Sequence, residues 1–468
     1  MKQVISIGSS ANDGTGDPIR TAFQKSAANF SELYGQIVNA GTTYGAVADG
    51  ATSINGIVSQ AIADSVKVLI FDQGVSFYNV TATISLPSGF SLVAGRGRPQ
   101  FKITSASVSR AFSMAGVTDA HIVGIALDGN KSVVPSDVSI VINNGSSQCS
   151  IEDCLFTNLA GYSVGGVAIS GGATRNVVRN CQFDNSAGTN ISIIGAHENI
   201  IDGNQMRNSG GWGVGVQSGS LRNSILNNQS IMSGLEAIAV QSDCWYTRVI
   251  GNHCELAGDN GISISARSCA VEGNICLTNQ YAGIGVWGSN NIISGNICKN
   301  NNQSATSVFG GIYLDAMYGG TGSFNIVSHN VLEDDQSSPT QRYGVRIKGN
   351  DYTAWAQGQV ISDLTNNSQL YHYSGLNIYK AQNAGTTGAT PPTHTSGTVS
   401  DGGVNWTYLG SFTTAAGALW NLVSGNIVNR FSIAAYFDAD SWQRNTLYTD
   451  AATSLTITAD GSVRAKPN

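Results

Sequence analysis

A short pattern recurs along the chain: two or three aliphatic side chains are followed closely by an asparagine. The recurring residues are Asn204, Asn228, Asn252, Asn274, Asn296 and Asn330, with a later one at Asn426. The first five intervals between them are 24, 24, 22, 22 and 34 residues. Repeats of about this length are typical of one supersecondary unit stacked on itself. We therefore expect a solenoid, which would offer an extended surface to a long ligand.

Each repeat contains a second segment in which aliphatic residues alternate with variable ones, at 213–217, 237–241, 261–265, 283–287, 311–315 and 344–348. Alternation with a period of two predicts a strand with one buried face. Gly, Asn and Ser between the strands favour turns, and no helical stripe fits there. Each repeat is thus predicted to be one coil of a parallel β-solenoid, with coils about 4.8 Å apart. The predicted buried face consists of Val214, Val216, Ile238, Val240, Ile262, Ile264, Ile284, Val286, Ile312, Leu314, Val345 and Ile347.

The asparagines have a physical reason to recur, because side-chain amides at the same turn of every coil can hydrogen-bond along the stack. Cys154 and Cys181 occupy that position in earlier coils, and Cys254, Cys276 and Cys298 lie two residues after an asparagine. We expect these last three to form an inward column of reduced thiols. The coil spacing is wider than a disulfide prefers, and a single column offers no tetrahedral metal site. No metal and no cofactor are predicted.

Composition limits the classes of partner. The formal net charge is −6 and 12% of the residues are charged, which is too neutral for a nucleic-acid or membrane-surface protein. No stretch reaches the 18 or so apolar residues of a membrane span, and the first ten residues lack the apolar core of a signal peptide. Eight cysteines in 468 residues do not form a disulfide framework. We expect a soluble, mostly β protein made in the cytoplasm.

The N-terminal segment, residues 1–40, differs in character. Asp17 and Pro18 predict a helix start, with Asp17 as the N-cap and Pro18 in the first turn. Apolar residues then follow at heptad spacing with one polar interruption, which predicts a short seam. Two interpretations stay open: the helix packs on its own chain, or it docks and oligomerises. The seam consists of Ile19, Phe23, Ser26, Phe30, Leu33 and Ile37.

Two segments resemble phage proteins. Residues 6–36, with NDGTGDPIRTAF and ANFSELY, resemble the N-terminal module of many phage tail and virion proteins. The helix predicted from Ile54 to Ile62 and the short strands after it resemble the entry to the pectate-lyase-like right-handed β-helices of phage tailspikes. This family has a longer acidic and Thr-rich run where the chain has Ala51–Ile54, a departure that affects only a turn. The resemblance implies a right-handed single-stranded parallel β-helix, a homotrimer, and docking to a phage tail or baseplate protein through the N-terminus. It also implies that the protein resides on the virion after synthesis in the host cytoplasm.

The repeat is interrupted near the C-terminus. Residues 365–412 are rich in Ser, Thr, Gly and Asn, with regularly placed aromatics, and predict a small inserted β-module. They resemble inserts of phage tail proteins, which implies carbohydrate contact; the alternative is that Trp406 and Tyr408 fill the core of the module. The predicted organisation is a docking segment at 1–40, a capped β-helix at 41–364, the module at 365–412, and final coils with C-terminal strands at 413–468.

The variable face of the repeated strands holds aromatic and charged residues. Aromatic rings can cover the C–H faces of sugars, while acids and arginines bind hydroxyls, so we predict binding of a glycan. The resemblance to phage tailspikes implies that this glycan is a bacterial surface polysaccharide. Scattered surface aromatics are the alternative. The predicted substrate-binding residues are Trp212, Asp243, Trp245, Tyr246, Arg267, Tyr281, Trp287, Tyr313, Arg346 and Lys348.

Glycoside hydrolysis needs two carboxylates, roughly 5–9.5 Å apart. Glu236 and Asp259 precede the same strand in adjacent coils and are predicted to lie about one coil spacing or slightly more apart. Asp315 is a third candidate, too distant to pair with Asp243 in one chain but able to pair across a subunit boundary. Asp243 and Arg267 are expected in one column, as an ion pair or an anion site.

The leading hypothesis is a polysaccharide depolymerase. The alternatives are a receptor-binding fibre without activity, and a lyase or epimerase for uronic acids in which Tyr313 or His253 abstracts the proton.

Overall fold

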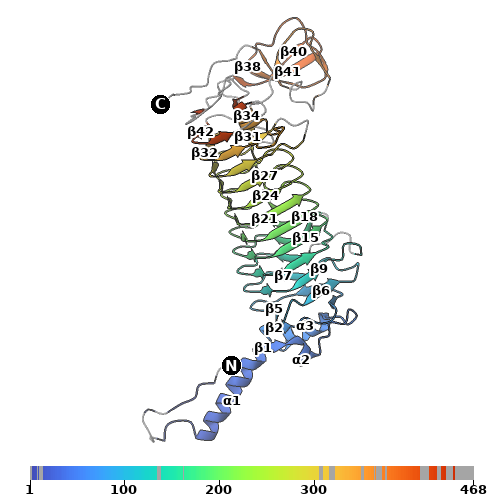
Figure 1. The fold of residues 1–468 in the computed structure, drawn as a ribbon, viewed down its shortest axis with the longest axis vertical. Helices are drawn as coiled ribbons and strands as arrows, with labels where there is room; N and C mark the ends of the chain where they lie inside the picture. Colours follow the sequence, from blue (N-terminus) through green and yellow to red (C-terminus); the bar gives the residue numbers. More distant parts are fainter. Residues whose placement is uncertain are drawn as a thin grey trace. The chain divides into compact units, whose positions relative to one another are not determined.

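The computed structural model describes residues 3–7, 9, 14–133, 139–161, 163–304, 309–315, 322–348, 353–362, 364, 371–374, 377–411, 421–429, 434–438 and 446–447. The chain divides into two compact units, Met1–Gly234 and Leu235–Asn468. In each unit, every coil contributes one strand to each of three parallel sheets, which we name sheets A, B and C (Figure 1). The parallel β-solenoid predicted from the repeat is thus confirmed.

In the first unit the strands of successive coils pair in parallel, as in Ile191 opposite Val214. Sheet A contains β2 (Val68–Phe71), β5 (Ser91–Ala94), β8 (His121–Val123), β11 (Ser150–Glu152), β14 (Val177–Arg179), β17 (Ile200–Asp202) and β20 (Ser224–Leu226). Sheet B contains β3 (Tyr78–Val80), β6 (Gln100–Ile103), β9 (Ala126–Asp128), β12 (Leu155–Thr157), β15 (Gln182–Ser186), β18 (Gln205–Ser209) and β21 (Gln229–Ser233). Sheet C contains β4 (Ile84–Ser85), β7 (Phe112–Ala115), β10 (Ile140–Asn143), β13 (Val164–Ser170), β16 (Thr189–Ile194) and β19 (Val214–Gln217).

The second unit repeats this arrangement. Sheet A contains β23 (Arg248–Ile250), β26 (Ala270–Glu272), β29 (Ile292–Ser294), β32 (Ile326–Ser328), β42 (Leu422–Ser424) and β45 (Thr446–Leu447). Sheet B contains β24 (His253–Glu255), β27 (Ile275–Leu277), β30 (Ile297–Lys299), β33 (Val331–Glu333) and β43 (Ile427–Asn429). Sheet C contains β22 (Ile238–Val240), β25 (Ile262–Ile264), β28 (Ile284–Val286), β31 (Gly310–Asp315), β34 (Tyr343–Lys348) and β44 (Ala434–Asp438).

The core of each unit is the inward face predicted from the alternation: Ile262, Ile264 and Ile284 are all fully buried. The asparagine ladder is also present. In the second unit Asn274 accepts hydrogen bonds at Oδ1 from the backbone N–H and the side chain of Asn252, both at 2.9 Å, and itself donates to Asn296. These bonds satisfy polar groups that would otherwise be buried without partners.

A second asparagine ladder was not predicted. It lies five residues upstream of the first and turns the chain into sheet A, with Asn176 donating to Asn199 and Asn199 to Asn223 in the first unit. In the second unit the backbone N–H of Asn291 donates to Asn325, and that of Asn325 to Asn421. The signal was present in the sequence, because five of the seven recurring asparagines have another asparagine five residues upstream; Asn252 and Asn274 have Thr247 and Cys269 there.

The cysteine column is confirmed. Cys254 is opposite Cys276, and Cys276 is opposite Cys298, in sheet B of the second unit. All eight cysteines are free and buried. Cys181 occupies the ladder position as predicted, since its backbone N–H donates to Asn204 at 2.9 Å.

At the N-terminus, helix α1 (Ile19–Gln36) forms where the seam predicted it, but Pro18, not Asp17, is the N-cap residue. Asp17 instead accepts from the backbone N–H of Ser6 and from Lys25, an interaction that lowers the pKa of Asp17. Asn29 exchanges hydrogen bonds with the backbone of Gln3. The seam residues Ile19, Phe23, Phe30 and Ile37 are exposed in the single chain.

Three short elements begin the solenoid of the first unit. Strand β1 (Ile37–Asn39) pairs in parallel with β2, and α2 (Ala40–Tyr44) follows it. Helix α3 (Asn55–Ala63) buries Val58 and Ala61, the face that the sequence predicted. None of the described helices is long and apolar enough to cross a membrane.

A small module with an antiparallel sheet interrupts the second unit between β34 and β42. Its strands are β35 (Thr353–Ala354), β36 (Val360–Ile361), β37 (Tyr371–Ser374), β38 (Asn377–Ala381), β39 (Gly385–Thr386), β40 (Thr398–Asp401) and β41 (Val404–Ser411). Trp406 is fully buried with Tyr379 in the core, and Tyr408 packs against them. The module's strands therefore begin upstream of the 365 boundary expected from composition. Most of the predicted final segment 413–468 lies outside the described residues.

Candidate functional site

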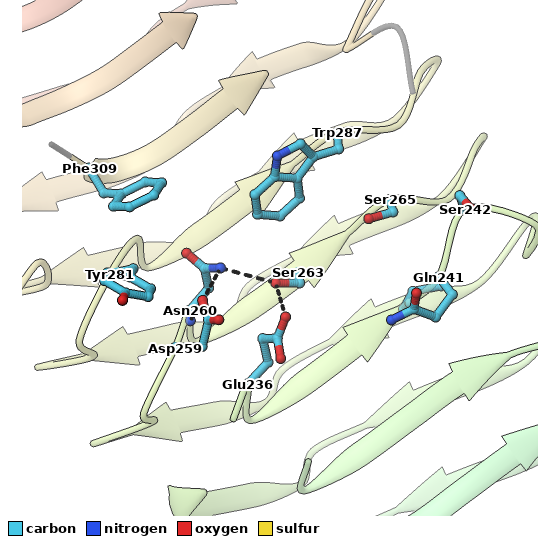
Figure 2. A pocket seen from close by; sticks show the side chains of 11 residues that line it. Glu236, Gln241, Ser242, Asp259, Asn260, Ser263, Ser265, Tyr281, Trp287 and Phe309 are labelled. Atoms are coloured by element: carbon cyan, nitrogen blue, oxygen red, sulfur yellow. Dashed lines mark hydrogen bonds between the residues drawn. The ribbon is translucent and has the colours of Figure 1, made fainter. Parts of the chain in front are cut away.

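The outward face of sheet C in the second unit is hollowed into a pocket of about 370 Å³ (Figure 2). Its lining comes from four successive coils and combines two carboxylates, small polar side chains and aromatic rings. The lining residues are Glu236, Val240, Gln241, Ser242, Asp259, Asn260, Ser263, Ser265, Tyr281, Trp287 and Phe309.

Strand register brings the two acids together. Ile238 of β22 is opposite Ile262 of β25, so the residues that lead into these strands lie one above the other. Glu236 precedes β22 by two residues and Asp259 precedes β25 by three. The predicted placement of Glu236 and Asp259 before equivalent strands of adjacent coils is therefore confirmed, and their predicted separation stays a prediction.

A chain of hydrogen bonds joins the two carboxylates (Figure 2). The Asn260 side-chain N–H donates to Asp259 Oδ1 at 2.7 Å and to Ser263 Oγ at 3.2 Å. The Ser263 hydroxyl donates to Glu236 Oε1 at 3.0 Å. Asn260 is only 3% exposed, and its Oδ1 accepts the backbone N–H of Ala282 at 2.9 Å, which fixes the orientation of the amide.

These links bound the distance between the acids. Because they measure 3.0, 3.2 and 2.7 Å, Glu236 Oε1 and Asp259 Oδ1 lie no more than about 9 Å apart, which does not exceed the upper limit of about 9.5 Å for the carboxylates of glycosidases. Burial, reinforced by the negative charge of Glu236, raises the pKa of Asp259 to about 6. The backbone N–H of Asn260, which donates to Asp259, acts in the opposite direction. An acid with such a pKa beside a second carboxylate can deliver a proton near neutral pH.

Aromatic rings form the other wall. The Trp287 ring lies over Gly285, where a Cβ atom would come within 2.4 Å of it, so glycine is needed for the ring to lie flat on the strand. The rings of Tyr281 and Phe309 are tilted against each other by 43°, with centroids 5.1 Å apart. Trp287 and Tyr281 were predicted from the sequence as substrate-binding residues, and both line the pocket.

Asp315 is not brought to the pair. It is 1% exposed, accepts a hydrogen bond from the Tyr313 hydroxyl at 2.7 Å, and is not a lining residue of the pocket. Tyr313 is also buried, with its ring against Phe309 and Trp287. The Arg346 guanidinium lies over the Tyr313 ring, 5.6 Å from its centroid. The catalytic role predicted for Asp315 and the substrate-binding roles predicted for Tyr313 and Arg346 stay predictions.

The expected column of Asp243 and Arg267 is wrong. Trp245, not Asp243, is opposite Arg267. The turn between sheets C and A is two residues longer in the earlier coil, and this shifts the register after the strands end. Trp245 and Tyr246 are exposed and lie edge to face, with centroids 6.3 Å apart.

Two further predicted residues lie apart from these. Trp212 belongs to the first unit, where its half-buried ring covers Gly215. Lys348 is the last residue of β34, with its backbone opposite Asp315, and its side chain lies outside the described part of the chain. His253, considered as a base, is in sheet B and contacts Glu255 at 3.0 Å.

Sequence reasoning missed Gln241, Asn260, Ser263, Ser265 and Phe309. The period-two alternation did indicate that Gln241, Ser263 and Ser265 face outward. Small polar residues on a solenoid strand are too common to single out; the contact with Glu236 distinguishes Ser263, and the position in the pocket lining distinguishes Gln241 and Ser265. Asn260 and Phe309 lie just before strands, where the alternation gives no direction.

Residues 110–275 match the family model described as "Right handed beta helix region". No curated protein sequence matches the chain. The A-module of mannuronan C-5 epimerase AlgE6 from Azotobacter vinelandii is similar with a TM-score of 0.56 and 13% identity, over 87% of this chain and 99% of that one. Polygalacturonase from Erwinia carotovora ssp. carotovora has a TM-score of 0.50 and 13% identity, over 64% of this chain and 94% of that one.

The Dettilon tailspike protein is a weaker structural neighbour, with a TM-score of 0.46 and 14% identity, over 78% of this chain and 80% of that one. The family match confirms the predicted all-β, right-handed parallel β-helix. At such identities the mannuronan epimerase module and the polygalacturonase share the fold with this chain, and the likeness shows the fold alone.

Proposed function

We propose that this protein is a tailspike-like enzyme that binds a bacterial surface polysaccharide and hydrolyses it. The observation that supports this proposal is the Glu236–Asp259 pair, joined through Ser263 and Asn260 at the floor of an aromatic-walled pocket. Enzymes named for action on polymeric sugars, a mannuronan epimerase and a polygalacturonase, share the fold.

The proposed mechanism gives the two acids different roles. Asp259, with a pKa raised to about 6, holds the proton and donates it to the glycosidic oxygen. Glu236 is the carboxylate that activates water or attacks the anomeric carbon. Trp287 and Tyr281 hold the sugar rings beside the acids, and the polymer continues along the outer face of sheet C.

The phage part of the proposal rests on the N-terminal segment. Residues 6–36 resemble the virion module of phage tail proteins. We propose that this segment docks to a tail or baseplate protein, and that the protein acts at the bacterial surface after synthesis in the host cytoplasm. The exposed seam of α1, with Phe23 67% and Phe30 58% exposed, supports association of three copies through this helix.

Substitution of the acids tests the enzymatic proposal. Purified protein is incubated with capsule, exopolysaccharide and O-antigen preparations, and new reducing ends are measured. Glu236→Gln and Asp259→Asn are near-isosteric, and each should lower turnover on the order of a hundredfold or more. The matched control is Glu272→Gln, at a half-buried outward position of sheet A, which should keep full activity.

Three other outcomes would reject this assignment. If both acid variants keep the parent's activity, the catalytic site lies elsewhere. If the parent releases no reducing ends from a polysaccharide that it binds, the protein is a receptor-binding fibre. If absorbance near 235 nm from unsaturated uronates accompanies the new reducing ends, the enzyme is a lyase.

A further inference from the structure

We infer that the pocket binds uncharged sugars and excludes uronic acids at the ring next to the two carboxylates. This inference rests on the proposed function, because it assigns the substrate class of the same site. It follows from the charges of the lining and from the positions of the cations in the second unit.

The pocket contains negative charge and no cation. Among its described lining residues, two are carboxylates and none is Lys, Arg or His. In the sequence, residues 305–308 (ATSV) come just before Phe309, and residues 316–321 (AMYGGT) come just after β31. Both stretches lie outside the described residues, and neither contains a cationic residue. A uronate in this pocket would add a third carboxylate without a partner, which is costly in a partly buried site.

The carboxylate of an acidic sugar could be neutralised by Arg267, Arg346 or Lys348, and the two of them whose side chains the structure describes, Arg267 and Arg346, are not lining residues of the pocket. Arg346 lies over the rings of Tyr313 and Tyr343, at 5.6 and 5.4 Å from their centroids, and Tyr313 does not line the pocket. Arg267 is exposed in the turn after sheet C, beside Trp245. His253 contacts Glu255 in sheet B. None of these three lines the pocket.

The remaining lining suits hydroxyl groups. Gln241, Ser242 and Ser265 offer neutral donors and acceptors at the end of the pocket away from Tyr281 and Phe309, and the Trp287 ring lies between the two groups (Figure 2). Neutral donors and aromatic faces recognise a hexose or deoxyhexose without requiring a charge. The same lining argues against proton abstraction next to a carboxylate, because the negative charge that develops there would have no cation to stabilise it.

The test is an array of bacterial surface polysaccharides, in which each uronate-containing polymer is present in native and carboxyl-reduced form. Carboxyl reduction converts the uronate to the neutral sugar and preserves the linkage. Binding is assigned to the pocket where Trp287→Ala lowers it at least tenfold. We expect pocket-dependent binding only to neutral polymers and carboxyl-reduced forms, and we expect it to change little between 50 and 500 mM NaCl because no ion pair forms.

A cation introduced into the lining gives an independent measurement. Gln241 is a half-buried lining residue, so the Gln241→Lys variant should fold. Its ammonium group could pair with a uronate, so the variant should bind native uronate polymers better relative to their reduced forms. Tighter pocket-dependent binding of a native uronate polymer by the parent protein would overturn the inference, as would an unchanged preference in the lysine variant. No pocket-dependent binding to any polymer would overturn it together with the proposed function.

The two proposals fail separately. Pocket-dependent binding to neutral polymers without release of reducing ends would reject hydrolysis and leave the sugar class standing. Hydrolysis of a native uronate polymer that the acid variants abolish would leave the proposed function standing and reject the sugar class.

Discussion

At the scale of single residues, the direction of the hydrogen bonds distinguishes the two acids. The Asn260 amide is oriented by the backbone N–H of Ala282, so its N–H groups must point to Asp259 and Ser263. The one hydroxyl proton of Ser263 is then available for Glu236. Asp259 Oδ1 accepts both the backbone and the side-chain N–H of Asn260, which leaves Oδ2 to carry a proton. Two chemically similar carboxyl groups thereby acquire different roles.

The raised pKa of Asp259 predicts the pH dependence of activity. If Asp259 is the general acid, only its protonated form is active, and that form is lost as pH rises through about 6. We expect kcat/KM to fall about tenfold per pH unit above this value. A profile that stays level from pH 6 to pH 8 on a cleaved polysaccharide would contradict the assignment of Asp259 as the acid.

The same pKa predicts a change in stability. Between the usual pKa of 3.8 and about 6, the folded protein binds a proton at Asp259 that the unfolded chain has released, so the free energy of unfolding decreases as pH rises through this window. Asp259→Asn removes that dependence. The difference in melting temperature, variant minus parent, should therefore be more positive at pH 8 than at pH 4. An equal difference at both pH values would show that Asp259 has an ordinary pKa.

At the scale of elements, the sequence was sufficient where each coil repeats a local rule. The alternation in segments such as 261–265 predicted the inward face of sheet C, and the recurring asparagine predicted the turn between sheets A and B. Both signals depend only on equivalent residues of adjacent coils lying opposite each other. The register after the strand ends could not be predicted, because it depends on turn length, and this is where the column of Asp243 and Arg267 was wrong.

The pocket depends on a coil that breaks the repeat. The step from Asn296 to Asn330 is 34 residues instead of 22, and the longer coil supplies Phe309 to the aromatic wall. The sequence showed that this coil is longer, but it gave no direction for the extra residues. Predicting the two acids, Tyr281 and Trp287 required only the regular register, whereas predicting Phe309 required the irregular coil.

Burial of the inward face predicts the effect of a charge placed there. Ile262 is fully buried, so Ile262→Asp should cost several kcal/mol and prevent cooperative folding. The matched control is Ile292→Asp, the same change at an outward position of sheet A that is 42% exposed, where we expect a change of about 1 kcal/mol or less. Thermal unfolding measures both. Soluble Ile262→Asp with the parent's melting temperature would contradict the strand register.

At the scale of the whole molecule, the N-terminal segment has its own local contacts. Asp17, Lys25 and Asn29 bind the backbone of residues 3–6, so the segment's order depends little on the coils that follow α1. These three residues lie within the stretch that resembles phage virion modules, which gives that stretch a structural reason for its composition. The first strand of the solenoid, β1, begins immediately after α1.

This boundary determines how the docking segment should be removed. A deletion of residues 1–40, the boundary predicted from the sequence, would also remove β1, which pairs with β2, and Asn39, whose side chain donates to Asp72 at 2.7 Å. Deletion of residues 1–36 spares both. We expect this truncated protein to keep the parent's melting temperature, glycan binding and hydrolysis, but to lose incorporation into virions and the association of copies.

Light scattering after size-exclusion chromatography would measure the mass of the assembly and so the association of copies. A full-length Phe23→Ser/Phe30→Ser variant separates the association of copies from docking to the virion. Because both side chains are exposed in the single chain, their replacement should leave α1 and the contacts of Asp17 intact while weakening a seam between copies. A truncated protein that binds but no longer hydrolyses would place the segment, or the copies it brings together, in the catalytic function. Unchanged mass for both variants would show that the copies associate through the solenoid instead, since a seam of fewer than three heptads is marginal alone.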